Sequence, residues 1–283
     1  NTAELNQDEQ ALQQALQSAK SQRVPTMTQL VDLIAINELL GTVESSGDGK
    51  NANLVAQLET ESLADKAAEF KTTNNDDTIG WIRVDYPVVY KAGVENYAYY
   101  ESKGYDKQYS KDGVIWADYE CTFPELSQNT TLYGHNWHNI YTPRTQANMQ
   151  ANDLMFSLVM SYNYTDFAQE NPFIYFSTTE QDYVFQVFAS YYTDLNFGYN
   201  YAQMSQEDFQ KVIAEAKAKS LSNYNVPVTS EDKIVTLSTC TRVHGNTNNQ
   251  RFVVMAKLVP VGTPSTTIST HSNPIAYNSS IDA

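Results

Sequence analysis

The stretch "IVTLSTC" at residues 234–240 decides the interpretation of this chain, because an alternating, strand-like run ends there at a cysteine. Successive side chains of a β-strand point to opposite faces. Val235 and Leu237 therefore share an apolar face, while Ser238 lies with Cys240 on a small, polar one. Such a polar face suits a groove that an extended peptide can enter. The thiol is a nucleophile if a base or a cation lies nearby, and a structural thiol otherwise.

An arginine is the first expected partner of this cysteine. A polar, asparagine-rich loop, "TRVHGNTNNQ" at 241–250, separates Cys240 from a second strand-like run that begins at Arg251. Two strands joined in this way are expected to pair antiparallel, which places Arg251 opposite Cys240. A guanidinium there can hold a substrate carbonyl or a developing oxyanion. Arg242, inside the loop, is the rival, and a plain surface role is the alternative for both arginines.

A histidine is the second expected partner. His135 follows a strand-like run and Gly134 in "TLYGHN", so it also lies at a strand end. His138 and His244 lie in loops, and a surface role is the alternative for each of these side chains. His135 and His138 could form a metal pair, but no third ligand follows at a spacing typical of zinc. We therefore expect neither a metal nor a cofactor.

Composition excludes several classes of function. The formal net charge of −15 argues against a nucleic-acid partner, which needs a basic surface, and against docking on anionic lipid. No run of 18 apolar residues is present to form a membrane-spanning helix. The two cysteines, Cys121 and Cys240, are too few for a disulfide framework or a structural zinc site. Cys121 lies among acidic residues, so we expect a structural thiol with a raised pKa.

The pattern along the chain changes near Thr78. Residues 1–72 are helical in pattern, with Pro25 and Gly41 as helix start and stop signals. The later part contains seven short β-branched and aromatic runs, which are "TIGWIRVDYPVVY", "DGVIWADY", "NTTLYGHN", "PFIYFST", "DYVFQVFASYY", "DKIVTLSTC" and "RFVVMAKLV". They predict a β-barrel or sandwich.

Two helices are expected between these strands, over 148–161 and 205–221. Ser205 and Asp208 form the expected N-terminal cap of the second helix. We divide the chain into a helical extension (1–75), a β-rich domain (76–261) and a C-terminal segment (262–283), which is expected to be a tail or a loosely docked strand.

Taken together, "TLYGHN", "TLSTC" and the "RFVV" run, in that order, resemble the sortase family. The N-terminal helices, the helix-bearing insert at 203–221 and "GVIWADY" resemble class B sortases in particular. The likeness covers about residues 76–260. It implies a mainly β fold, a closed and mostly antiparallel barrel of about eight strands, with N-terminal helices and a helix inserted before the penultimate strand.

The resemblance also implies a cysteine transpeptidase that cleaves a C-terminal sorting signal of secreted proteins at a threonine. Cys240 would attack the threonine carbonyl and form a thioester. His135 would protonate the leaving amine and then deprotonate the incoming one, and Arg251 would steady the oxyanion or the bound signal. Ser238 and Thr239 flank the nucleophile and are candidates for contact with the substrate.

The partners implied by the resemblance are secreted proteins with an Asn-Pro-x-Thr-like signal, and an amine acceptor in a cell-wall peptide or a pilin. The implied location is the outer face of a Gram-positive cell membrane, with an anchoring helix before Asn1; a soluble protein is the alternative.

Three other functions fit some of the same residues. A papain-like peptidase uses cysteine and histidine, but there the cysteine comes first in the chain. An L,D-transpeptidase has a Ser-His-Gly context before its cysteine, which is absent before Cys240. A non-catalytic surface adhesin or binding module fits the 20 tyrosines and the many asparagines. The reactivity of the Cys240 thiol separates the enzymes from the binding module.

Overall fold

The computed structural model describes residues 54, 56, 62–82, 86–145, 148, 150 and 153–277, all within a unit that spans Asn53–Ala283. Its strands are β1 (Thr78–Ile82), β2 (Tyr86–Val89), β3 (Ile115–Ala117), β4 (Asn129–Tyr133), β5 (Phe173–Thr178), β6 (Asp182–Asp194), β7 (Ser222–Asn223), β8 (Ile234–Cys240), β9 (Gln250–Val259) and β10 (Ser269–Thr270). Its helices are α3 (Leu63–Thr73), α4 (Thr165–Glu170), α5 (Gln206–Lys219) and the 3₁₀ helices η1 (Val94–Asn96) and η3 (Met155–Asn163).

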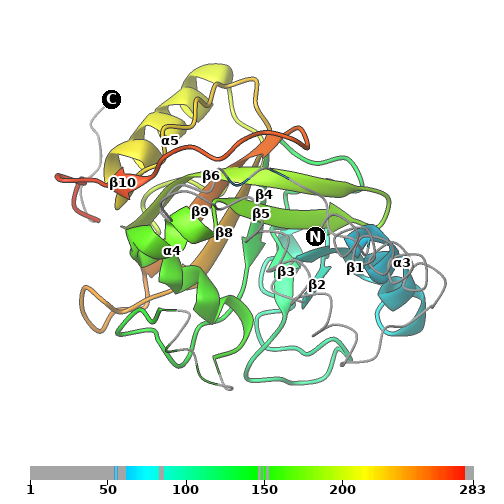
Figure 1. Cartoon of the computed structure of the whole chain (residues 1–283). Helices are drawn as coiled ribbons and strands as arrows, with labels where there is room; N and C mark the ends of the chain where they lie inside the picture. The colour runs from blue at the N-terminus through cyan, green and yellow to red at the C-terminus, as the bar shows by residue number, and fades with distance from the viewer. Residues whose placement is uncertain are drawn as a thin grey trace, which may run out of the picture. The chain divides into compact units, whose positions relative to one another are not determined.

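Eight of the strands form a closed barrel in the order β1–β2–β3–β4–β8–β9–β6–β5, and β5 pairs with β1 to close it (Figure 1). The neighbours β2–β3 and β4–β8 are parallel, and the other neighbouring pairs are antiparallel. The predicted mainly β, mostly antiparallel barrel is therefore confirmed. β7 and β10 form a separate two-stranded sheet.

Seven strand-like runs became eight barrel strands because the first run holds two strands. β1 and β2 pair antiparallel with a register that ends at Ile82↔Tyr86, so the chain reverses between them. Residues 83–85 lie outside the described part of the chain. The run "TIGWIRVDYPVVY" carries β-forming residues through the reversal, so composition alone did not mark the turn.

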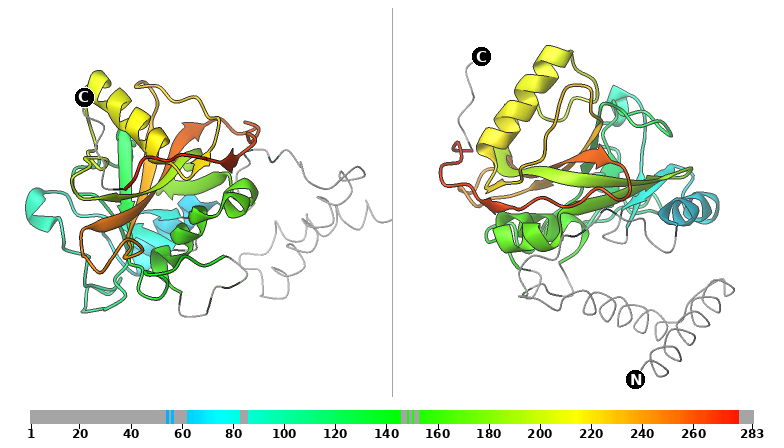
Figure 2. Two further views of the ribbon diagram at one scale, coloured as in Figure 1. Left: turned by 90° about the vertical axis from the view of Figure 1, so that its left-hand side faces the viewer. Right: turned by 45° about the horizontal axis from the view of Figure 1, so that its top comes forward.

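The inserted helix α5 forms where it was predicted. Ser205 is its N-cap, and its side chain accepts a hydrogen bond from the Asp208 backbone N–H. Phe209, Ile213 and Ala216 are buried on one face of the helix. Figures 1 and 2 show α5 on the outside of the barrel beside β6, which explains why almost all of β6 is buried. α5 precedes β8, the penultimate strand of the barrel, as expected.

The N-terminal expectation is only partly within the described residues. α3 confirms the helical pattern at Leu63–Thr73, and Ser62 caps it by accepting from Asp65 N–H. The helices predicted within 1–41 lie outside the described residues. Within the described part of the chain, no helix combines the length and the apolar character needed to span a membrane.

The helix predicted over 148–161 is confirmed in its second half, where the 3₁₀ helix η3 spans Met155–Asn163, and α4 follows it. Asp153 and Leu154 are not helical, and residues 149, 151 and 152 lie outside the described residues. The Asp153 carboxylate accepts hydrogen bonds from Arg144 Nη1 at 2.7 Å and from Gln150 N–H at 2.8 Å. This carboxylate thus ties Gln150 and Arg144 together just before η3 begins.

The C-terminal segment is held along α5 by several contacts. β10 pairs with β7, and the buried ammonium of Lys219 donates to the carbonyls of Ala276 and Tyr277 at 3.3 Å each. The Tyr277 ring stacks on His244, with ring centroids 4.4 Å apart and an interplanar angle of 12°. His244 belongs to the loop between β8 and β9, so this segment braces that loop from outside.

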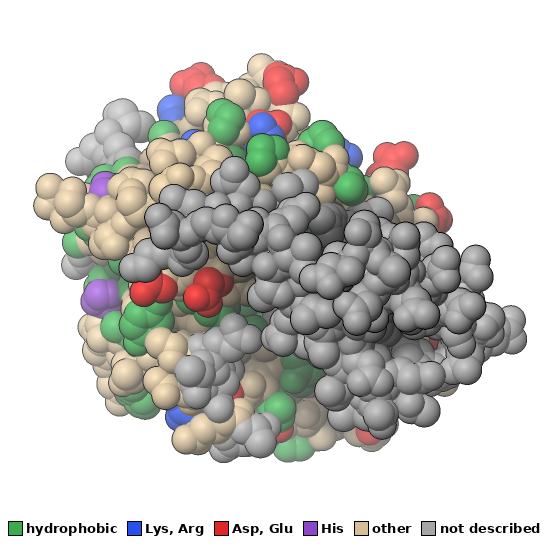
Figure 3. Space-filling view, in the orientation of Figure 1, with side chains coloured by type: hydrophobic (Ala, Val, Ile, Leu, Met, Phe, Trp, Pro, Cys, Tyr) green, Lys and Arg blue, Asp and Glu red, His purple; other side chains and the backbone are tan. Residues whose placement is uncertain are grey.

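The surface agrees with the acidic composition. Acidic side chains lie in separate groups on the face in Figure 3, and near α5 they lie beside basic ones. On α5, Lys211 pairs with Glu207 at 3.1 Å and with Asp208 at 3.6 Å. Exposed pairs of this kind add little stability.

We predict that α5 depends on the buried Phe209. Replacing Phe209 by Ala leaves a cavity under the helix and should lower the free energy of unfolding by about 3–5 kcal/mol. The matched control, Gln210→Ala, changes an exposed neighbour and should alter stability by less than about 0.5 kcal/mol. Urea unfolding followed by circular dichroism measures both, and equal effects would contradict the packing described for α5.

Candidate active site

The end of the barrel where β4 and β8 stop carries the predicted nucleophile and base. The two strands run parallel, and their last Cα pair is Tyr133↔Ser238. Parallel neighbours end at the same edge of a sheet, so the residues that follow this pair leave side by side. His135 and Cys240 each stand two positions beyond it. Strand register alone therefore brings them to one end of the barrel.

Three hydrogen bonds extend this pairing beyond the strands. Gly134 N–H donates to Ser238 O at 3.4 Å, and Thr239 Oγ1 donates to Gly134 O at 2.7 Å. Asn136 Nδ2 donates to Cys240 O at 3.4 Å. The residues on both sides of the histidine are thus tied to the strand that carries the cysteine.

Close packing around position 134, just before His135, requires a glycine there. A Cβ atom at this position would lie 2.5 Å from Ile115 Cδ1 and 2.7 Å from Phe156 Cγ. Phe156 also donates its N–H to His135 O at 3.0 Å. The backbone therefore passes between two buried side chains, and only a residue without a side chain fits there.

The predicted pairing of Cys240 with Arg251 is observed. They are Cα partners at the end of the β8–β9 register, and both side chains are half-buried. Arg251 Nη1 donates to Asn248 O and to Gln250 O, at 2.9 Å each, so the guanidinium is bound to the loop between the strands. We call the end of the barrel that carries His135, Cys240 and Arg251 the rim.

The polar face of β8 is not the open groove expected from the sequence. Thr236 and Ser238 are buried on this face, and only Cys240 is half-exposed. The Thr236 hydroxyl donates to Asn129 Oδ1 at 2.7 Å, and Asn129 Nδ2 in turn donates to Tyr199 O at 2.8 Å. A buried hydroxyl needs such a partner. Asn129 of β4 supplies it for Thr236, and the loop before α5 supplies the acceptor for the Asn129 amide.

Tyr199, in that loop, is a rim residue that the sequence reasoning missed. Its buried hydroxyl is 2.8 Å from Ser238 Oγ. Burial raises the pKa of Tyr199, while Arg251 acts to lower it and Cys240 to raise it, so the phenol lies within electrostatic reach of both. Its only sequence signal was a tyrosine-rich loop, "NFGYNY", which has no strand or helix period.

The two candidates for substrate contact differ from Cys240 in exposure. Ser238 and Thr239 are both buried, and their hydroxyls are bonded to Tyr199 and to Gly134 O. They lie at the rim but face the protein interior in this structure.

The His135 ring has a defined environment. Its Nε2 lies 2.5 Å from Glu101 O, in the loop between β2 and β3. Trp137 stacks on the ring with centroids 5.1 Å apart and an angle of 29°, and Trp116 lies at 5.8 Å and 56°. Aromatic neighbours in this number were not expected from the sequence.

The rival residues are bound elsewhere. Arg242 Nη2 donates to Asn248 Oδ1 at 2.6 Å. His244 packs between Tyr192 and Tyr277, and burial lowers its pKa. The other two histidines are His138, which is exposed, and His271, whose Nδ1 is 2.8 Å from Ser220 O.

Cys121 has the character of a structural thiol. It is 1% exposed, and both cysteines are free. Burial first, with a smaller contribution from Asp118, raises the pKa of Cys121 to about 12. The expected direction is correct, but burial and not the acidic neighbours is the main cause.

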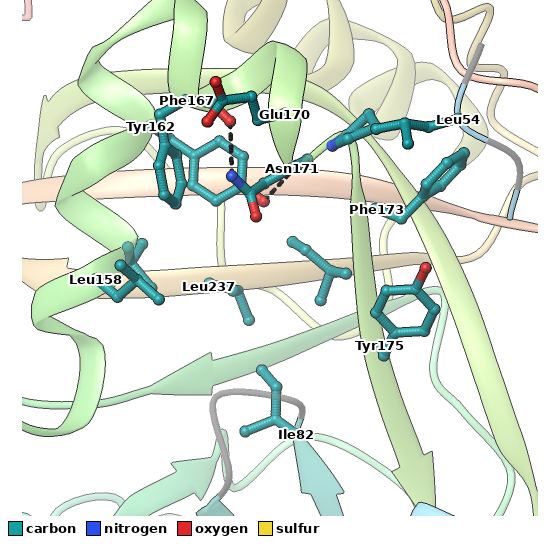
Figure 4. A pocket seen from close by; sticks show the side chains of 13 residues that line it. Leu54, Ile82, Leu158, Tyr162, Phe167, Glu170, Asn171, Phe173, Tyr175 and Leu237 are labelled. Carbon is teal, nitrogen blue, oxygen red and sulfur yellow. Dashed lines mark hydrogen bonds between the residues drawn. The ribbon is translucent and has the colours of Figure 1, made fainter. Parts of the chain in front are cut away.

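The structure also contains a pocket of about 440 Å³, which Figure 4 shows. Side chains of η3, α4 and β5 line it, with Leu237 of β8 and the Glu170 carboxylate. It does not include the thiol, the imidazole or the guanidinium, so we take the rim as the candidate active site. Across the residues that the structure describes, no three His, Cys, Asp or Glu side chains are grouped to hold a metal ion.

The rim combines three chemical abilities. A half-exposed thiol can act as a nucleophile, an imidazole can move a proton, and a guanidinium can stabilise negative charge on oxygen. This set fits acyl transfer through a thioester.

Comparisons with known proteins cover the barrel that carries the rim. The family model of the sortase domain matches residues 78–259. Sortase B of Staphylococcus aureus is 30% identical over 193 residues, which are 66% of this chain and 72% of that protein. Sortase B of Listeria monocytogenes is 28% identical over 191 residues, which are 65% of this chain and 71% of that protein.

Solved structures agree with the sequence comparison. The Staphylococcus aureus sortase B–substrate complex has a TM-score of 0.58 and 27% identity, and covers 71% of this chain and 88% of its own. Sortase B of Clostridium perfringens has a TM-score of 0.55 and 25% identity, and covers 68% of this chain and 98% of its own.

We predict that the two thiols differ in reactivity. In the folded protein a thiosulfonate reagent should modify Cys240, which is half-exposed, and leave the buried Cys121 untouched. Intact-mass spectrometry should show one addition in the native state and two after denaturation. In Cys240→Ala the native addition should disappear. Native labelling of Cys121, or none at all, would contradict this assignment.

Proposed function

The chain belongs to the sortase family and is most like class B sortases, and on this premise we propose that it cleaves a C-terminal sorting signal and transfers the protein to an amine. Family membership makes the chain a cysteine transpeptidase and not a non-catalytic binding module. The observation that carries the proposal is the strand register, which brings His135, Cys240 and Arg251 to one rim.

Cys240 is the nucleophile in this proposal. Its sulfur attacks the carbonyl carbon of the signal's threonine, and the thiol proton passes to His135. The tetrahedral intermediate carries its negative charge on the former carbonyl oxygen. When it collapses, the C–N bond breaks and a thioester to Cys240 remains. The position of Cys240 supports this role, because it is the half-exposed member of a polar strand face that is otherwise buried.

His135 acts as the acid and base. It returns the proton to the leaving amine nitrogen as the C–N bond breaks. In the second half of the reaction it takes a proton from the incoming amine, which attacks the thioester carbonyl and releases the thiol. The hydrogen bonds that tie Gly134 and Asn136 to β8 support this role, because they hold the backbone of His135 next to the strand that carries the nucleophile.

Arg251 stabilises the oxyanion or holds the signal. Its Nη1 donates to the carbonyls of Asn248 in the loop and Gln250 at the start of β9, and the guanidinium carries further N–H donors on Nε and Nη2. The loop contacts limit the freedom of the side chain, which favours a donor group prepared in advance for a developing charge.

Ser238 and Thr239 stay candidates for substrate contact, though both are buried. For Ser238 this requires its hydroxyl to exchange the Tyr199 phenol for a group of the substrate. Thr239 would contribute through the backbone it fixes at Gly134.

The finer assignments follow the class B likeness. We propose an Asn-Pro-x-Thr-like signal on secreted proteins, and a cell-wall peptide or a pilin as the amine acceptor. A solved complex of the Staphylococcus aureus relative with a substrate supports recognition of a protein signal. We place the enzyme at the outer face of a Gram-positive cell membrane, anchored before Asn1, and keep residues 76–261 as the catalytic domain, 1–75 as a helical extension and 262–283 as a C-terminal tail.

The proposal predicts a thioester on Cys240. Incubation with a set of pentapeptide signals should give a covalent adduct on Cys240, detected by mass spectrometry, that a small amine releases as a transpeptidation product. Cys240→Ala should abolish the adduct, and His135→Asn should abolish turnover. The control Cys121→Ala removes the other thiol and should keep activity. Turnover that survives Cys240→Ala would refute the mechanism.

Arg251→Ala should lower kcat by about 100–1,000-fold, the usual loss for one oxyanion donor. Arg251→Lys should recover only part of the loss, because an ammonium lacks the planar fork of donors. The control is Arg242→Ala in the same loop, which should keep most of the activity. Equal losses in the two alanine variants would show that the loop, and not the Arg251 guanidinium, matters.

A further inference from the structure

The ring of His135 sits in a slot built by the loop between β2 and β3 and by two tryptophans. Its parts are Glu101 O, Gly113, Trp116 and Trp137, and we call it the imidazole slot. We propose that this slot holds His135 with its hydrogen on Nε2, so that Nδ1 is the nitrogen that exchanges the proton in the reaction. The inference rests on the proposed role of His135 and adds the nitrogen and the groups that select it.

The hydrogen bond to Glu101 decides which nitrogen carries the hydrogen. Nε2 lies 2.5 Å from Glu101 O, and a carbonyl oxygen can only accept. Nε2 must therefore donate, in both the neutral and the protonated ring. The neutral ring then has its lone pair on Nδ1, where a proton can be accepted.

Trp137 sets the plane of the ring. It stacks on His135 at 29°, and its own position is held because Nε1 donates to Lys111 O at 3.1 Å. The Lys111 ammonium lies 5.5 Å from the centroid of the indole ring. Trp137 is 41% exposed, so this stacking accounts for a large aromatic side chain at the surface. Trp137 is thus a positioning residue that acts through His135.

Gly113 closes the slot at the edge of the ring. A Cβ atom on Gly113 would lie 2.8 Å from His135 Cδ2 and 3.2 Å from Nε2, and 3.2 Å from Glu101 O. The backbone there has a φ of +61°, which glycine adopts readily. The slot therefore has room for the imidazole and for no added methyl group unless the ring shifts.

The proton path follows from this tautomer. When the thiol of Cys240 attacks, its S–H bond breaks and an N–H bond forms at Nδ1, which leaves an imidazolium with hydrogen on both nitrogens. The Nδ1–H bond then breaks as the proton moves to the leaving amine nitrogen. Nε2 keeps its hydrogen and its bond to Glu101 O throughout, so the ring does not need to turn between the two steps.

Nuclear magnetic resonance tests the tautomer without any activity. Histidine labelled with ¹⁵N is incorporated, and the His135 signals are assigned from their loss in His135→Asn. Two-bond and three-bond ¹⁵N–¹H correlations are recorded at a pH above the titration of this ring. The expected result is a pyrrole-type Nε2 and a pyridine-type Nδ1. The opposite pattern, or an even mixture, would overturn the proposal.

Kinetics test the positioning role. Gly113→Ala should push the ring and lower kcat by about 10–100-fold, while KM changes little. The matched control is Gly262→Ala, which also has a positive φ, of +91°, but has no atom within 4 Å of the added Cβ. It should keep its kcat. Equal losses of kcat in both variants would show that backbone strain alone is the cause, and would overturn the proposal that Gly113 positions the His135 ring.

Trp137→Ala should lower kcat by about tenfold, and Trp137→Phe should recover most of it by keeping a stacked ring. Tyr109→Ala, an exposed aromatic in the same β2–β3 loop, is the control and should have no effect on kcat.

The nuclear magnetic resonance spectrum tests the tautomer of His135, and the adduct experiment tests the proposed function, so either can fail without the other. A missing adduct on Cys240 would refute the proposed function and leave the tautomer standing, while an Nδ1–H ring in an active enzyme would refute only the slot.

Discussion

The parallel pairing of β4 with β8 is the constraint on which the site depends. A slip of one residue in this register would turn every side chain of β8 to the other face and would bury Cys240. Packing prevents such a slip, because Leu132 and Leu237 are paired in the core and Asn129 accepts the Thr236 hydroxyl. The same hydrophobic and polar contacts that stabilise the barrel therefore also bring His135 and Cys240 to the same end of it.

Buried polar groups connect the barrel to the loops around the rim. Ser238 and Thr236 would be costly to bury without partners, and Tyr199 and Asn129 satisfy them. This ties the loop before α5 to the face of β8, and α5 covers β6 behind it. The thiol stays half-exposed because Cys240 lies one step beyond the last covered position of that face. Stability and access to the Cys240 thiol thus depend on one network.

Two irregular segments, one early and one late in the described chain, contact the residues at the rim and the loop beside it. The loop between β2 and β3 contacts His135 through Glu101 O, and the C-terminal segment contacts the β8–β9 loop where Tyr277 stacks on His244. Loops that carry function on a rigid barrel are free to differ without altering its core. These contacts are thus the place where a chain can tune the geometry of its site while the strand register is unchanged.

The sequence by itself determined the β class of the fold, the helix α5 with its Ser205 cap, and the family motifs around His135, Cys240 and Arg251. Strand alternation, cap residues and short motifs are local, so a linear chain displays them. The tertiary structure alone decided that Ser238 and Thr239 are buried, that Tyr199 reaches the rim, and that Glu101 and Trp137 hold the imidazole. Apart from the contact of Trp137 with His135, which is two residues away, those contacts join segments far apart in the chain. Which loop covers which strand depends on how the whole barrel closes, and no local pattern encodes it.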